Sequence, residues 1–145
     1  MDRFEKFSLA MAEIHKCCHQ IAAKELSRFG LKGPHAIYLV TLKSHPEGLS
    51  MPELCELLSK DKADVSRMMA ILEKGNFVVK KGQYRAHYLL TDSGKDVAEK
   101  VYRKAQDAVN QAGADLDDSQ RETFYNALDS IVTNLKRMSK EGILS

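Results

Sequence analysis

The chain has 145 residues, of which 43% are hydrophobic and 29% charged, and its formal net charge at neutral pH is +2. This length is that of one ordinary domain and argues against a multidomain enzyme. The composition is typical of a globular protein and excludes a disordered chain. We therefore expect one domain over residues 1–145.

The cysteines and the N-terminus predict the cellular compartment. The three cysteines, Cys17, Cys18 and Cys55, are an odd number with two adjacent, which is not the pattern of a secreted disulfide framework. The first residues carry charges where a signal peptide needs an apolar run. No stretch approaches the ~18 uninterrupted apolar residues of a membrane span. These features predict a cytoplasmic protein.

The first part of the chain predicts two helices. From Phe4 to Ile21 apolar residues recur in alternating steps of three and four, which indicates a long amphipathic helix within about residues 2–30. Glycines and a proline at positions 30–34 break it. A shorter apolar helix follows and stops before Pro46.

The next segment carries two helix starts in close succession. Ser50 with Glu53 three residues later forms a capping box. Asp61 is a second N-cap, and Asp64 adds negative charge to the first turn of the helix that follows. Two short helices around a tight turn predict a helix-turn-helix. We expect the first of them to bury three leucines, Leu54, Leu57 and Leu58.

The apolar period then changes from 3.6 to 2. Residues 77–80 and 87–90 are predicted strands, and the basic, glycine-bearing segment 81–86 is the predicted hairpin tip. Thr91 or Asp92 caps another long helix, and a last helix carries an apolar stripe from Phe124 to Met138.

The order of elements predicts a mainly α fold: a winged helix-turn-helix with six helices and a two-stranded wing. Its DNA-binding lobe spans about residues 34–91, and its dimerisation helices span about residues 2–30 and 92–141. The long helices carry apolar stripes that a monomer of this size cannot cover. We therefore expect a homodimer.

The positive charge is concentrated on the helix-turn-helix and the wing. Residues 60–87 contain seven cations and three acids, a net +4, so the rest of the chain carries −2. A basic face on a winged helix is typical of duplex DNA binding. Surface lysines alone produce a modest excess too, and the coincidence with the motif is what favours DNA.

Candidate DNA-binding residues follow from the way a recognition helix enters the major groove with its N-terminal residues near base edges. Arg67 can contact a guanine or a phosphate, and Asp64 either accepts from a cytosine or serves only the helix cap. Tyr84 and Arg85 at the hairpin tip are candidates for the minor groove or flanking phosphates. The full candidate set is Ser50, Met51, Lys60, Lys62, Ala63, Asp64, Ser66, Arg67, Lys81, Tyr84 and Arg85.

An ordered set of motifs over residues 33–94 resembles the MarR (multiple antibiotic resistance regulator) family. The motifs are Gly48-Leu49-Ser50, Glu53-Leu54, Leu57-Leu58, Asp61-Lys62, Val65-Ser66-Arg67, Leu72-Glu73-Lys74 and Leu90-Thr91-Asp92-Ser93-Gly94. The resemblance implies a dimeric transcription regulator that binds a pseudopalindromic operator. It also implies a ligand or oxidant that acts between the dimerisation helices and the DNA-binding lobe and usually releases DNA.

The wing departs from the family pattern. Most members carry Asp-x-Arg there, and the arginine reaches DNA. This chain has Gln83-Tyr84-Arg85, which keeps the arginine and loses the acid that usually braces it.

The first helix carries an unusual cluster. His15, Cys18 and His19 are spaced to share one face, with Cys17 beside them. A metal site is one interpretation, a redox-sensing thiol at Cys17 or Cys18 is another, and buried packing of Cys18 in the apolar stripe is the third. We expect no cofactor beyond such a metal ion.

The remaining alternatives for regulation are a small-molecule effector and no effector at all. His15, His19 and Tyr38 are the candidates for an effector pocket.

Catalysis is not expected. The sequence has no glycine-rich phosphate loop, Gly-x-Ser-x-Gly or His-Glu-x-x-His motif. The alternative to a DNA-binding regulator, most simply a repressor, is a winged helix used for protein interaction without an operator of its own. That alternative predicts an apolar recognition helix, whereas Lys62, Ser66 and Arg67 are polar.

Overall fold

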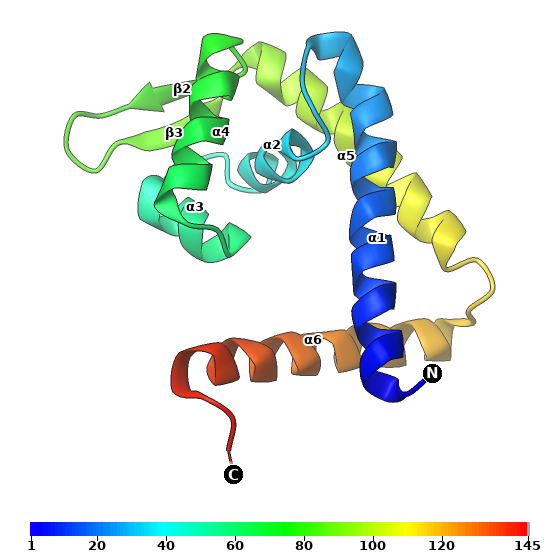
Figure 1. Cartoon of the computed structure of the whole chain (residues 1–145). Helices are drawn as coiled ribbons and strands as arrows, with labels where there is room; N and C mark the ends of the chain where they lie inside the picture. Colours follow the sequence, from blue (N-terminus) through cyan, green and yellow to red (C-terminus); the bar gives the residue numbers. More distant parts are fainter. Residues whose placement is uncertain (145) are drawn as a thin grey trace. The chain divides into compact units, whose positions relative to one another are not determined.

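The computed structural model describes residues 1–144, which divide into two compact units at residues 106/107. The first unit holds helices α1 (Arg3–Leu26), α2 (His35–Lys43), α3 (Met51–Leu58) and α4 (Lys62–Lys74), with a 3-10 turn, η1 (Ser27–Phe29). It also holds the strands β1 (Leu49–Ser50), β2 (Val78–Lys81) and β3 (His87–Leu90). Figure 1 shows this order along the chain.

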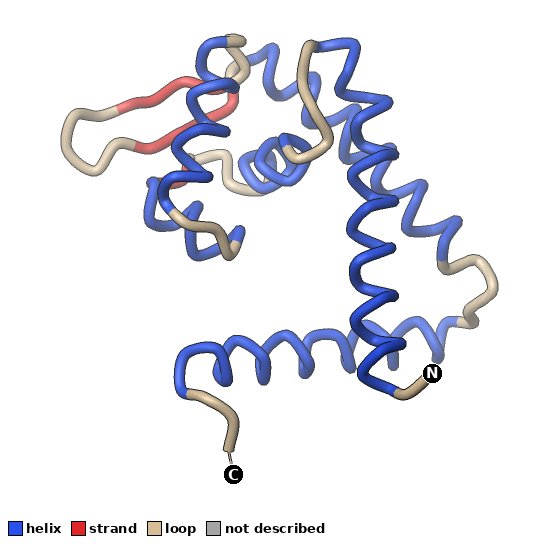
Figure 2. The backbone as a smooth tube through the Cα atoms, viewed as in Figure 1, coloured by secondary structure: helices blue, strands red, loops and turns tan. Residues whose placement is uncertain are grey.

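Helix α5 (Asp92–Ala112) begins in the first unit and ends in the second, which continues into α6 (Asp118–Glu141). Six α-helices and the β2–β3 hairpin confirm the predicted winged helix-turn-helix (Figure 2). Within residues 1–144, no helix combines the length and apolar character that a membrane crossing needs.

The sheet contains one strand more than the sequence predicts. The strand order is β1-β3-β2, all antiparallel, and β1 pairs with β3 through Leu49 opposite Tyr88 and Ser50 opposite His87. A two-residue strand is too short to show a period of 2, so its sequence gives no signal. Its effect is to tie the start of α3 to the wing.

The helix caps form as the sequence predicts. Ser50 and Glu53 make a reciprocal capping box at α3, and the Asp61 side chain accepts from the Asp64 amide at α4. Thr91 is the residue that caps α5, since its Oγ1 accepts from the Gly94 amide at 3.0 Å. The caps fix where α3 and α4 begin, and therefore which side chains lie at the start of α4.

The core of the first unit lies beneath the helix-turn-helix. It is formed by fully buried side chains from α1, α2, α3, α4 and α5, among them Leu26, Tyr38, Leu39, Leu54, Met69, Leu72 and Val97. The prediction that Leu57 is buried with Leu54 is wrong, because the Leu57 side chain is 51% exposed. Leu54 alone of the residues in α3 is fully buried, since this short helix presents one narrow face to the core.

Candidate nucleic-acid interface

Helix α4 presents the predicted recognition residues on its open face. Lys62 is its first residue, and Lys62, Ala63, Ser66 and Arg67 are all exposed. Positions 62 and 66, like positions 63 and 67, are four residues apart and so lie one turn above each other on the same face. Val65 and Met69 face the core instead and fix the rotation of the helix.

The Asp64 carboxylate lies in the first turn of α4 and contacts Arg67. The Arg67 guanidinium forms an ion pair with the Asp64 carboxylate one turn away. The cap itself belongs to Asp61, whose Oδ1 accepts from the Asp64 amide at 2.8 Å. Because the Arg67 side chain is 67% exposed in this pair, the pair is weak and leaves the guanidinium free to exchange partners.

A groove of about 750 Å³ lies between the starts of α3 and α4 and the wing. Cations from two elements line it: Lys62 from α4, and Lys80 and Arg85 from the wing. Ser50, Met51 and Ser66, also predicted from the sequence, line it as well. Five of the predicted residues and one further lysine therefore meet at a single concave surface.

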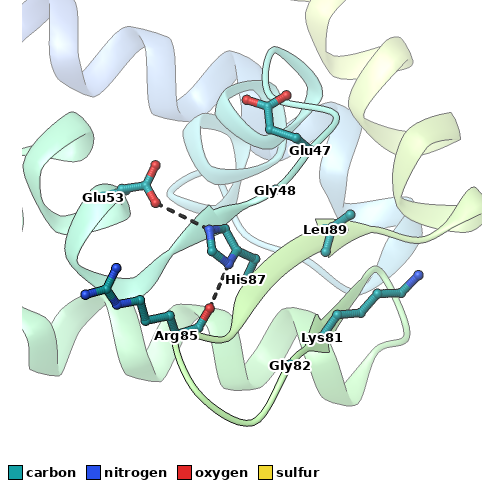
Figure 3. Close-up of a pocket in the computed structure, with 8 residues that line it drawn as sticks. All are labelled: Glu47, Gly48, Glu53, Lys81, Gly82, Arg85, His87 and Leu89. Carbon is teal, nitrogen blue, oxygen red and sulfur yellow. Dashed lines mark hydrogen bonds and ion pairs between the residues drawn. The ribbon is translucent and has the colours of Figure 1, made fainter.

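The two lysines of β2 lie on opposite sides of the wing. Successive side chains of a strand point to opposite faces. Lys80 lines the groove beside Lys62, whereas Lys81, which the sequence analysis selected, lines a second cavity of about 580 Å³ (Figure 3). The register of β2 against β3, with Lys80 opposite Tyr88 and Lys81 opposite His87, decides which of the two lysines faces the groove.

The wing tip is open and carries an unusual backbone. Tyr84 is 86% exposed, and the Arg85 guanidinium lies 5.7 Å from the centre of its ring. Arg85 has φ +55°, in the left-handed region that L residues with long side chains rarely adopt. The carbonyl oxygen of Arg85 lies 2.8 Å from Nδ1 of His87, a residue that the sequence analysis did not select.

Lys60 is exposed in the turn between α3 and α4, at the edge of the helix-turn-helix. It completes the placement of the predicted DNA-binding residues.

The cluster in α1 brings two histidine rings together. His15 and His19 lie side by side, with ring centroids 4.1 Å apart. Among residues 1–144, no three His, Cys, Asp or Glu side chains are placed to hold a metal ion together.

The cysteines of α1 are both exposed, so the interpretation of Cys18 as a buried packing residue is wrong for the single chain. Desolvation and the Glu13 carboxylate raise the pKa of the Cys17 thiol, whose Sγ donates to Glu13 at 3.6 Å. A raised pKa keeps this thiol protonated near neutral pH, the opposite of what an activated sensor thiol needs.

Tyr38 lies away from solvent in α2. Its side chain is fully buried, and its hydroxyl finds no hydrogen-bond partner among residues 1–144, as is also true of Nε2 of the buried His35. Burial raises the pKa of Tyr38, so the hydroxyl stays neutral.

The arrangement of α3, α4 and the β2–β3 hairpin is that of a winged helix-turn-helix. Residues 29–86 match the family model described as "MarR family", which confirms the resemblance seen in the sequence. No curated protein matches the sequence.

Solved structures of other proteins have the same fold. A MarR family transcriptional regulator from Listeria monocytogenes complexed with 26mer DNA has a TM-score of 0.83 at 19% identity, covering 100% of this chain and 99% of the other. The S. aureus MepR–DNA complex has a TM-score of 0.82 at 19% identity, covering 92% and 99%. A MarR transcriptional regulator from Methanosarcina mazei Go1 has a TM-score of 0.83 at 19% identity, also covering 92% and 99%.

Proposed function

We propose that this protein is a transcription regulator that binds duplex DNA in a sequence-specific manner. The start of α4 enters the major groove and the wing lies over the adjacent backbone or minor groove. The observation that carries this proposal is the groove between α3, α4 and the wing, lined by Lys62, Lys80 and Arg85. A basic concave surface beside an exposed recognition helix is what the phosphate backbone of a duplex requires.

The roles of individual residues follow from their positions. Arg67 leaves Asp64 and contacts a guanine through two hydrogen bonds, while Ala63 is placed to meet a thymine methyl group. Lys60, Lys62, Lys80 and Lys81 neutralise phosphates, which positions the protein without reading sequence. Ser50 and Met51 at the start of α3 line the groove and lie beside the DNA backbone.

Two of the similar solved structures are complexes with DNA, which supports the proposal. The polar groove favours it over a winged helix that binds only protein. Such a module needs an apolar recognition face, and the exposed residues at the start of α4 are Lys62, Ala63, Ser66 and Arg67.

We also propose that the protein is a homodimer through its long helices. In α6, all of whose residues the structure describes, none is buried, and Phe124, Ile131 and Leu135 are exposed. Helix α1 likewise exposes Phe4, Leu9 and Ile14. Apolar faces of this length are stable in water when a second copy covers them.

The oligomeric state is measured by sedimentation velocity. The wild type is expected at twice the mass of the chain, and Leu135→Asp is expected to shift it toward the monomer. Lys136→Asp, at a neighbouring exposed polar position, is the matched control and leaves the dimer intact. A monomeric wild type refutes this part of the proposal.

We propose further that the regulator acts as a repressor that a small molecule, a metal ion or an oxidant releases. The α1 cluster allows two direct probes. Release of DNA by Zn²⁺ that is lost in His19→Ala supports a metal signal, and release by hydrogen peroxide that is lost in Cys17→Ser supports an oxidant. If neither probe releases DNA, the cluster is not the sensor.

DNA binding is tested by fluorescence anisotropy with a duplex from upstream of the protein's own gene and a scrambled duplex of equal length. A preference of about 10³-fold or more with a steep salt dependence supports a sequence-specific regulator. A negligible preference at every salt concentration, repeated with a pool of random duplexes, contradicts it.

A further inference from the structure

His87 lies where the wing meets the start of α3. It is the first residue of β3, paired with Ser50 of β1 on one side and with Lys81 of β2 on the other. Its two ring nitrogens face different groups: Nδ1 is 2.8 Å from the Arg85 carbonyl oxygen, and Nε2 is 3.6 Å from Oε1 of Glu53 (Figure 3). One imidazole therefore connects the wing tip with α3.

The two partners of His87 determine which of its ring nitrogens carries the hydrogen in the neutral imidazole. A carbonyl oxygen can only accept, so Nδ1 carries the hydrogen and donates it to Arg85. In the neutral imidazole, Nε2 then has a lone pair facing the Glu53 carboxylate, and neither group can donate. A second proton makes Nε2 a donor, and the contact with Glu53 becomes an attractive ion pair.

Hydrogen bonds from Ser50 keep the Glu53 carboxylate ionised, so that it can act as the anionic partner of His87. Ser50 donates to its Oε1 from Oγ at 2.8 Å and from the backbone amide at 3.3 Å. These hydrogen bonds, followed by the nearby His87 and His45, lower the pKa of Glu53. The carboxylate consequently stays ionised over the range in which imidazoles gain their second proton, between about pH 8 and pH 5.

The other charged groups facing His87 come from both sides of the wing. Glu47, Lys81 and Arg85 line the same cavity as His87 and Glu53, and Lys62 and Lys80 line the groove that His87 also borders. The cations lie on the wing and α4, where DNA is proposed to bind. Glu47 lines only the cavity, whereas Glu53 lines both the cavity and the groove.

The backbone of Arg85 has an unfavourable conformation, so the hydrogen bond from His87 to its carbonyl helps to hold it in place. Its φ of +55° is unfavourable for an arginine, and its carbonyl is held only through His87 among the side-chain contacts of residues 1–144. The acid that braces the wing arginine in the family pattern is absent, since Gln83 stands two residues before Arg85.

We propose that His87 is a positioning residue for DNA binding: it holds Arg85 in place through the Arg85 carbonyl and Glu53, and a second proton on the ring tightens this hold. The proposal rests on the proposed DNA-binding function. It assigns to His87 and Glu53 the bracing role that the wing sequence lacks. It also makes the affinity for DNA increase as the pH falls below neutrality.

A direct contact between protonated His87 and a phosphate also gives tighter binding at low pH, and Glu53→Gln separates the two roles. Glutamine preserves the capping box, because it also serves at this position, but removes the negative partner. Positioning through Glu53 predicts that the pH dependence is lost in Glu53→Gln. A phosphate contact predicts that it is kept, together with an extra unit of salt slope that His87→Gln removes.

The experiment measures the dissociation constant of the operator duplex at pH 6.0 and 7.5 for the wild type, His87→Gln and Glu53→Gln. His45→Gln is the matched control, since His45 also lies near Glu53 but bonds to the Thr41 carbonyl. We expect the dissociation constant to fall between pH 7.5 and pH 6.0 in the wild type and in His45→Gln. This fall is expected to be about two- to fivefold larger than in His87→Gln and Glu53→Gln, which is the range that a half-exposed ion pair supports. Equal pH dependence in all four proteins overturns the proposal, and so does a pH dependence retained in Glu53→Gln.

A second readout uses the free protein. At pH 8 the ¹⁵N shifts of His87 are expected to show the hydrogen on Nδ1, and the amides of residues 84–86 are expected to shift with pH in the wild type but not in Glu53→Gln. A hydrogen on Nε2, or identical amide shifts in both proteins, overturns the proposal. If the wild type binds no duplex, the proposed function fails, and these spectra still decide whether His87 holds the wing.

Discussion

Replacing Arg67 with alanine tests the proposed entry of α4 into the major groove. In the free protein Arg67 is paired with Asp64, and this exposed pair one turn apart is worth about 0.2–0.5 kcal/mol. A bidentate contact with guanine contributes about 1–3 kcal/mol. For each copy of Arg67 on the duplex, the alanine variant is therefore expected to lose a net 0.5–2.8 kcal/mol or so, roughly a 2- to 100-fold rise in Kd.

The assay is fluorescence anisotropy at fixed salt with the operator and a scrambled duplex, and thermal unfolding serves as a control for folding. Arg67→Ala is expected to weaken the operator more than the scrambled duplex. Unchanged operator binding refutes the placement of α4. Asp64→Ala separates a base contact from the pairing with Arg67: tighter binding shows that Asp64 only holds Arg67, and weaker binding shows a base contact.

Four further predictions follow from the same structure. Lys62→Ala is expected to weaken operator and scrambled DNA alike and to reduce the salt slope by about 1, and an unchanged slope contradicts its role at a phosphate. Gly94→Ala is expected to destabilise the protein by about 1–3 kcal/mol in urea unfolding, because the added Cβ would clash with the Phe77 carbonyl oxygen; unchanged stability contradicts this packing. Leu54→Ala is expected to cost about 2–5 kcal/mol in the same assay, and a loss below 1 kcal/mol or so argues against its place in the core. Burial lowers the pKa of His35, so the unfolded chain binds its proton first, and stability is complete above about pH 6.5 and declines as the pH falls below it; His35→Gln is expected to flatten this decline, and an unaltered profile refutes the assignment.

The elements of the fold that depend on neighbouring residues could be predicted from the sequence. The caps at Ser50 and Asp61 involve contacts three residues apart, so they set the starts of α3 and α4 before any tertiary packing is known. With those starts fixed, the exposure of Lys62 and Arg67 follows from the helix period. The change of period at residue 77 likewise located the wing.

The features that the sequence did not reveal depend on contacts between distant segments. Strand β1 exists because Leu49 lies opposite Tyr88, and two residues carry no periodic signal. The separation of Lys80 from Lys81 depends on strand register, which a pair of adjacent lysines leaves open. His87 contacts Glu53, which lies 34 residues earlier in the sequence, and no local motif predicts that contact.

The basic groove between α3, α4 and the wing is proposed to bind one specific duplex sequence. The most direct test is the anisotropy titration of the wild type with its own upstream duplex and the scrambled duplex from low to physiological salt. The account predicts a preference of about 10³-fold or more that persists as salt weakens both complexes. Equal affinities across the whole salt series, for this duplex and for a random pool, would contradict it.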